Sequence, residues 1–113
     1  MKQVLRAAIL AVVLAFSGQP ILAQDFQKGI DAYNSGDFET ALQEWRPLAE
    51  QGYAKPQYNL GVLYENGKGV PQDDAEAVKW YRLAAEQGNA YSQHDLGVMY
   101  RDGDGVPQDG AEA

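Results

Sequence analysis

The chain has 113 residues and no cysteine, and its 16 acidic against 9 basic residues give a formal net charge of −7. This length suits one small domain, and the lack of cysteine excludes disulfides and thiol chemistry. The negative charge disfavours nucleic acid and anionic membrane surfaces as partners and favours cationic ones.

Residues 1–23 have the pattern of a secretory signal peptide. Lys2 and Arg6 precede an unbroken apolar run over residues 7–16, and Ala23 offers a small residue for cleavage. The run is too short for a bilayer, which takes about 20 residues. We expect a periplasmic or secreted protein with no stable membrane insertion after signal cleavage; an uncleaved membrane anchor is the alternative.

Residues 24–53 predict a degenerate helix pair. Helices are expected at about 26–35 and 38–51, joined by a tight turn at Gly36 and Asp37. Residues 37–52 align with residues 73–88 at a spacing of 36, whereas Tyr33 and Gly36 align with Tyr64 and Gly67 at a spacing of 31. We interpret this unit as having a shorter connection between its helices.

The rest of the chain repeats itself. Residues 46–77 align without a gap with residues 82–113, and 20 of the 32 positions are identical, which is typical of a stacked repeat protein. Apolar residues at helical spacing predict a helix from Pro56 to about Asn66 and another over residues 90–101. Between them, Asp73 or Asp74 caps a helix that ends at Gly88. The domains are therefore repeat 1 at 54–89 and repeat 2 at 90–113, truncated after a last helix begins near residue 109.

The repeated motif resembles the Sel-one-like repeat family, a relative of the tetratricopeptide repeats. This resemblance implies a right-handed, tetratricopeptide-like α-solenoid of antiparallel helix pairs, with a concave surface that binds proteins or peptides. It also implies an exported bacterial protein and favours the periplasm. The first copy supplies Ala54, Leu60, Gly61, Tyr64, Gly67, Gly69, Val70, Pro71, Asp73, Ala77, Val78, Trp80, Tyr81, Ala84, Ala85 and Gly88; the second supplies Ala90, Leu96, Gly97, Tyr100, Gly103, Gly105, Val106, Pro107 and Asp109.

Most of the repeated residues are interpreted as structural. Glycine inside a helix costs about 1 kcal/mol relative to alanine, so its recurrence at Gly61 and Gly97 predicts close approach of helix backbones. The glycines that follow each predicted first helix supply positive φ angles in the link. The aromatic residues at repeat spacing are expected to form core layers.

Candidate binding residues are sought on the first helix of each repeat. The copies differ there at Lys55, Tyr58, Asn59 and Glu65 in one and Tyr91, His94, Asp95 and Arg101 in the other. Selection for a partner and solvated drift both explain such differences. Gln57 and Gln93 are identical, and an amide both donates and accepts, so main-chain recognition is possible for them. The predicted protein-binding residues are Lys55, Gln57, Tyr58, Tyr91, Gln93 and His94.

No catalytic, metal or cofactor site is predicted, and the protein is expected not to be an enzyme. A cysteine-rich branch of the family is linked to β-lactam hydrolysis, which leaves a β-lactam hydrolase as a remote alternative. Neither Ser35 nor Ser92 begins a Ser-x-x-Lys motif, and the single His94 does not suit a zinc site. The glycine-rich links lack both a phosphate-loop Gly-Lys-Ser/Thr and a calcium-loop ligand set.

A second interpretation concerns the C-terminal end of the stack. The helix that would cover Leu96, Val98, Met99 and Tyr100 is cut off at Ala113. The chain is then a truncated fragment or a self-associating unit of a longer repeat protein, with possible self-association through the open C-terminal end.

Overall fold

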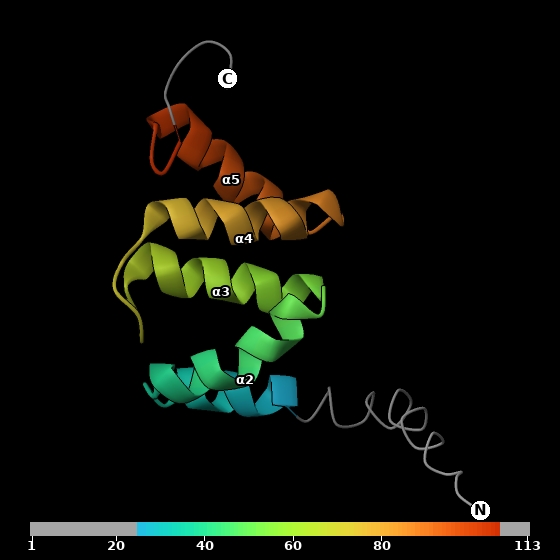
Figure 1. The fold of residues 1–113 in the computed structure, drawn as a ribbon, viewed down its shortest axis with the longest axis vertical. Helices are drawn as coiled ribbons and strands as arrows, with labels where there is room; N and C mark the ends of the chain where they lie inside the picture. The colour runs from blue at the N-terminus through green and yellow to red at the C-terminus, as the bar shows by residue number, and fades with distance from the viewer. Residues whose placement is uncertain (1–24, 107–113) are drawn as a thin grey trace, which may run out of the picture.

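The computed structural model describes residues 25–106 as a stack of helices (Figure 1). Residues 25–34 are helical, followed by α2 (Phe38–Glu50), α3 (Ala54–Asn66), α4 (Asp74–Glu86) and α5 (Ala90–Asp102). Each helix packs on the next, and no strand occurs between residues 25 and 106. The expected all-α stack of helix pairs is thereby confirmed. No helix in this range is long and apolar enough to cross a membrane.

Side-chain caps begin the helices where the sequence places short polar residues. The carboxylate of Asp37 accepts from the backbone N–H of Thr40 at 3.2 Å, and that of Asp73 accepts from Glu76 at 3.1 Å. Asp73 is therefore the cap, and Asp74 is the first helical residue. The helix predicted from Pro56 begins two residues earlier, at Ala54, and keeps the proline in its first turn.

Left-handed glycines end the first helix of each repeat. Gly67 closes α3 with φ 66° and Gly103 closes α5 with φ 76°, a region that side chains rarely adopt. Gly69 and Gly105 also have positive φ, and a Cβ on Gly105 would lie 2.5 Å from the carbonyl oxygen of Asp74. The chain thus needs glycine there both for conformation and for space.

The core consists of two clusters at repeat spacing. The first contains Trp45 of α2, Leu60 and Leu63 of α3 and Trp80 of α4, together with Ala32, Ala41 and Ala49. The second contains Tyr81 and Met99, together with Ala77 and Val78, and Leu96 packs against it. Tyr81 and Leu60 are wholly buried, as expected for core layers.

The two helix-interior glycines differ in their surroundings. A Cβ on Gly61 would lie 2.5 Å from Cδ1 of the Tyr81 ring, so this position faces a side chain rather than a helix backbone. A Cβ on Gly97 would meet nothing within 4 Å, and Gly97 is exposed. The predicted backbone contact is therefore wrong at Gly61, which is needed for space beside the Tyr81 ring. At Gly97 the prediction is untested, because the helix expected to pair with α5 lies outside the described residues.

The first helix of the first unit matches α3 at different spacings at its two ends. A Cβ on Gly29 would lie 2.6 Å from Cδ1 of Trp45, as one on Gly61 would meet Tyr81. The ring of Phe26 lies 6.1 Å from that of Trp45, and the ring of Tyr58 lies 5.6 Å from that of Tyr81. Gly29 and Phe26 thus contact Trp45 as Gly61 and Tyr58 contact Tyr81, at a spacing of 32. The end of the helix keeps the predicted spacing of 31: the Asp37 N–H donates to the carbonyl oxygen of Ala32 as the Lys68 N–H donates to that of Leu63, and Gly36 and Gly67 both have positive φ.

Two sequence predictions concern other parts of the chain. The signal peptide at residues 1–23 and the helix expected to begin near residue 109 lie outside the described residues.

Candidate protein-binding groove

Two neighbouring pockets form a groove on the face made by the first helix of each pair. One has a volume of about 270 Å³ and is lined by Ile30, Tyr33, Trp45, Tyr58, Asn59 and Val62. The other has a volume of about 300 Å³ and is lined by Phe26, Ile30, Lys55, Tyr58, Asn59, Asn89 and Tyr91. Because they share Ile30, Tyr58 and Asn59, they are continuous along helix 25–34 and α3. We call them the inner and outer pockets.

Three of the predicted binding residues line the outer pocket. Lys55 and Tyr58 come from α3 and Tyr91 comes from the first turn of α5. The rings of Tyr58 and Tyr91 lie 5.8 Å apart, and Tyr91 is 71% exposed. An exposed aromatic ring beside an apolar pocket is the kind of side chain that anchors protein partners.

The two glutamines have structural contacts instead. Gln57 is buried; its amide donates to the carbonyl oxygen of Ala49 at 3.1 Å and accepts from Gln87 at 2.9 Å. Gln93 makes the matching bond to the carbonyl oxygen of Ala85 at 3.1 Å, on an exposed surface. We therefore remove Gln57 from the candidate binding residues, because its amide is used inside the fold.

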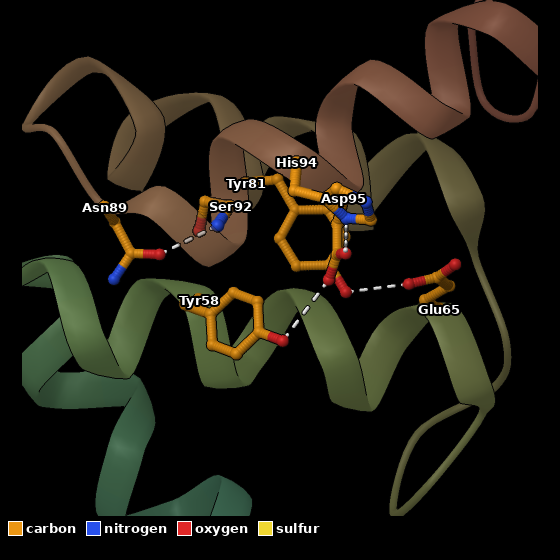
Figure 2. Close-up of polar contacts among 7 residues, drawn as sticks. All are labelled: Tyr58, Glu65, Tyr81, Asn89, Ser92, His94 and Asp95. Atoms are coloured by element: carbon orange, nitrogen blue, oxygen red, sulfur yellow. Dashed lines mark hydrogen bonds and ion pairs between the residues drawn. The ribbon is translucent and has the colours of Figure 1, made fainter.

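Hydrogen bonds between polar side chains connect α3 to α4 and α5 (Figure 2). The hydroxyl of Tyr58 donates to Asp95 at 3.3 Å, and that of Tyr81, rising from α4, donates to Glu65 at 2.7 Å. Burial, followed by the negative charge of Asp95, raises the pKa of Tyr58 to about 12. Burial and the hydrogen bond to Glu65 raise the pKa of Tyr81 even further above its usual range. Both phenols therefore stay protonated at neutral pH and act as donors.

His94 lies beside this network and lines neither the inner nor the outer pocket. Its Nδ1 is 3.1 Å from the second carboxylate oxygen of Asp95, and its side chain is 77% exposed (Figure 2). A protonated imidazole in that position adds a positive charge next to Asp95, but its exposure limits the strength of the pair.

The pockets also contain residues that the sequence did not single out. Phe26 and Ile30 come from the degenerate first unit, and Asn89 caps α5 by accepting from the backbone N–H of Ser92 at 2.8 Å. Phe26 and Ile30 are four residues apart, as apolar residues on one face of a helix are, and this spacing is the sequence feature that could have identified them. Among residues 25–106, no three histidine, aspartate or glutamate side chains gather as metal ligands would.

Comparison with known proteins places the chain in a family. The family model of the Sel1 repeat matches residues 57–89 and 90–113. The chain belongs to the Sel1 repeat family. The Sel-one-like resemblance expected from the motif is confirmed. This family consists of helical repeat scaffolds, and the two matched segments coincide with the repeats that carry α3 to α5.

Curated relatives of this Sel1 repeat protein are regulators and binding proteins. An exopolysaccharide production negative regulator of Rhizobium leguminosarum is 36% identical over 94 residues, spanning 71% of this chain and 35% of the relative. The DAP3-binding cell death enhancer 1 of Rattus norvegicus is 34% identical over 74 residues, spanning 66% of this chain and 14% of the relative. The chain thus spans about a third or less of the length of these relatives.

Solved structures share the fold. A protective antigen of uropathogenic Escherichia coli strains, which displays an SLR fold, superposes with a TM-score of 0.75 at 44% identity, covering 87% of this chain and 21% of that one. A Sel1 repeat protein from Oxalobacter formigenes superposes with a TM-score of 0.73 at 35% identity, covering 88% of this chain and 43% of that one. Both are similar to this chain across the described helices.

Proposed function

We propose that this Sel1 repeat protein is an exported, non-catalytic adaptor that binds a protein or peptide in the groove between helix 25–34, α3 and α5. The observation that carries the proposal is the pair of continuous pockets with the exposed ring of Tyr91 at their edge. Membership of a repeat-scaffold family supports it, as do relatives named as a regulator and as a DAP3-binding protein.

The binding test compares two exposed tyrosines. A partner is first isolated on the immobilised full chain and identified. The double variant Tyr58→Ala/Tyr91→Ala is expected to lose that partner, because both rings line the outer pocket. Tyr53→Ala is the matched control, since Tyr53 is 42% exposed and lines neither pocket. Equal binding by the double variant and wild type, or loss only with Tyr53→Ala, contradicts the groove assignment.

Export and lack of catalysis are tested separately. The leader pattern of residues 1–23 predicts that protein recovered from the periplasm begins after Ala23. Protein retained in the cytoplasm with Met1 in place contradicts export. Hydrolysis of a chromogenic β-lactam by the purified protein would support the alternative that it is a β-lactam hydrolase.

Self-association through the C-terminal end of the stack is the second candidate. Of the residues expected to be exposed there, Met99 is buried and Leu96 packs against the core, but a pocket with apolar and charged lining residues lies between α4 and the residues Gly105 and Val106. This pocket of about 470 Å³ is lined by Val78, Arg82 and Leu83, with Ala75, Lys79, Glu86, Gly105 and Val106. Leu83 is 41% exposed there. We expect concentration-dependent dimers that Leu83→Glu abolishes, as measured by sedimentation velocity. A wild-type monomer at all concentrations contradicts this candidate.

A further inference from the structure

One face of α4 combines apolar and charged residues at helical spacing. Along this helix, the pocket of about 470 Å³ is lined by Ala75, Val78, Lys79, Arg82, Leu83 and Glu86. Residues three, four and seven apart lie on one side of a helix, so these six form a single stripe, which we call the α4 stripe. Val78 is its buried floor, and the other five residues are exposed. An exposed leucine beside an apolar floor marks a surface that another molecule can cover.

The charge of the α4 stripe differs from that of the whole chain. Lys79 and Arg82 stand against the single acid Glu86, whereas the chain has a formal net charge of −7. Two copies of the chain therefore repel each other least when they meet through this face. Within residues 25–106, Glu86 has no ion-pair partner, and Lys79 pairs only with Glu76 of its own helix, at 3.5 Å. The stripe thus offers one positive and one negative side chain to a second molecule.

We propose that two copies of this chain associate through the α4 stripe, with their α4 helices antiparallel about a two-fold axis. In a symmetric contact the same patch of both copies is buried, so the patch must be complementary to itself. Leu83 of each copy enters the hole that the other copy forms with Ala75, Val78, Lys79 and Arg82, which have the i, i+3, i+4, i+7 spacing of such holes. This inference rests on self-association, the second candidate of the proposed function, and names its surface and geometry.

That register also brings opposite charges together. With Leu83 centred on its hole, Lys79 of one copy and Glu86 of the other are offset by about one helical turn, roughly 5 Å along the axis. Side chains tilt toward the N-terminus of their helix, so in antiparallel helices these two side chains lean toward each other. Arg82 and Lys79 of the other copy lean apart, and Arg82 already lies over the ring of Tyr100, 5.5 Å from its centre. The two-fold axis produces the contact between Lys79 and Glu86 twice.

The corresponding face of α2 lacks the residues for this contact. At a spacing of 36, Pro47 stands in place of Leu83 and Gln43 stands in place of Lys79, whereas Glu50 matches Glu86. The α2 face therefore has neither the leucine nor the lysine that the symmetric contact needs. The surface is specific to α4, and Glu50 provides a matched position for a control.

Charge reversal on the full chain tests the pairing. The dissociation constant of the dimer is measured by sedimentation velocity over a series of concentrations. Lys79→Glu and Glu86→Lys should each weaken the dimer about tenfold, because each replaces two attractive contacts by two repulsive ones. Both changes in one chain should restore the wild-type value, since the pairs form again with their signs exchanged. Glu50→Lys changes the net charge as Glu86→Lys does and should not weaken the dimer.

Cysteine cross-linking tests the direction of the helices. The chain has no cysteine of its own, so an introduced thiol is unique. In the proposed contact Ala75 of one copy faces Glu86 of the other, whereas the two copies of Ala75 lie about 17 Å apart along the axis. A mixture of Ala75→Cys and Glu86→Cys chains should therefore form a disulfide-linked dimer on mild oxidation. Ala75→Cys alone should not, because a disulfide needs Cα atoms within about 7 Å. Circular dichroism confirms that each variant is folded.

The outcomes separate this inference from the proposals on which it rests. A chain that stays monomeric at all concentrations overturns both the inference and the self-association candidate, and leaves residues 107–113 of the same chain or a different protein to cover the pocket. Dimers that neither charge reversal weakens, or that cross-link through Ala75→Cys alone, overturn only the antiparallel contact. The groove assignment is tested apart from both, through Tyr58 and Tyr91. A dimer that the double reversal restores and that cross-links only in the mixture supports the proposal.

Discussion

Replacing Gly61 by alanine should destabilise the protein, although alanine is the better helix former. The new Cβ would lie 2.5 Å from Cδ1 of Tyr81, and that ring is wholly buried. No real Cβ tolerates this distance, so either the ring or α3 must move. A moved ring also strains the 2.7 Å hydrogen bond from the Tyr81 hydroxyl to Glu65.

The size of the effect follows from three contributions. Overpacking of a core costs about 1–3 kcal/mol, and weakening one hydrogen bond costs about 1 kcal/mol. The gain in helix propensity returns about 1 kcal/mol. We therefore expect a net loss of about 2 kcal/mol in the free energy of unfolding, measured from urea denaturation curves with an unchanged slope.

Gly97→Ala provides the matched control. Gly97 occupies the same position in α5, but nothing lies within 4 Å of its Cβ direction, so only the helix propensity changes. This variant should be more stable than wild type by up to about 1 kcal/mol. Equal shifts of the urea midpoint in the two variants, in either direction, would refute the steric explanation.

Three other predictions use the same unfolding assay. Gln57→Ala should lose about 1–2 kcal/mol, because it removes two hydrogen bonds of a buried side chain, one to the carbonyl oxygen of Ala49 and one from Gln87. The exposed Gln93→Ala should lose less than about 0.5 kcal/mol, and equal losses contradict this explanation. Asp73→Ala should lose about 1 kcal/mol by removing the cap of α4, and Asp74→Ala should lose less; the reverse order would assign the cap to Asp74. The raised pKa of Tyr58 means that the unfolded chain loses its phenol proton at a lower pH than the folded protein does. The resulting contribution to stability is fully present below about pH 10 and is lost as pH rises toward about 12. An Asp95→Asn variant with the same tyrosinate titration as wild type contradicts the contribution of Asp95 to this pKa.

The fold was predictable because the features that specify it recur at one period. Asp73 as a cap, Gly67 as a left-handed terminus and Tyr81 as a core ring all depend on local chemistry that the sequence displays directly. The alignment of the first unit was less certain, because its helix lacks the repeated leucine and glycine pair. The contact between Gly29 and the Trp45 ring indicates a spacing of 32 at the start of that helix, whereas the predicted spacing of 31 holds at its end, at Gly36.

The groove was predictable only in part. Tyr58 and Tyr91 were found because the two copies differ there, which indicates that the scaffold does not need a particular residue. Gln57 was misinterpreted because its identity in both copies reflects a bond to the preceding helix rather than a partner. Sequence alone does not say on which side of a helix an amide points.

The glutamine contacts between neighbouring helix pairs have a consequence for the shape of the groove. Gln57 joins α3 to the carbonyl oxygen of Ala49 at the end of α2, and Gln87 at the end of α4 reaches the carbonyl oxygen of Gly52 at 2.8 Å. These bonds set the angle at which one helix pair sits on the previous one, and neither residue lines the pockets. Curvature and recognition are therefore separate properties of this chain. A change at Gln87 would open or close the groove around an unchanged set of lining side chains, so affinity for partners of different width can be tuned from residues outside the pocket lining.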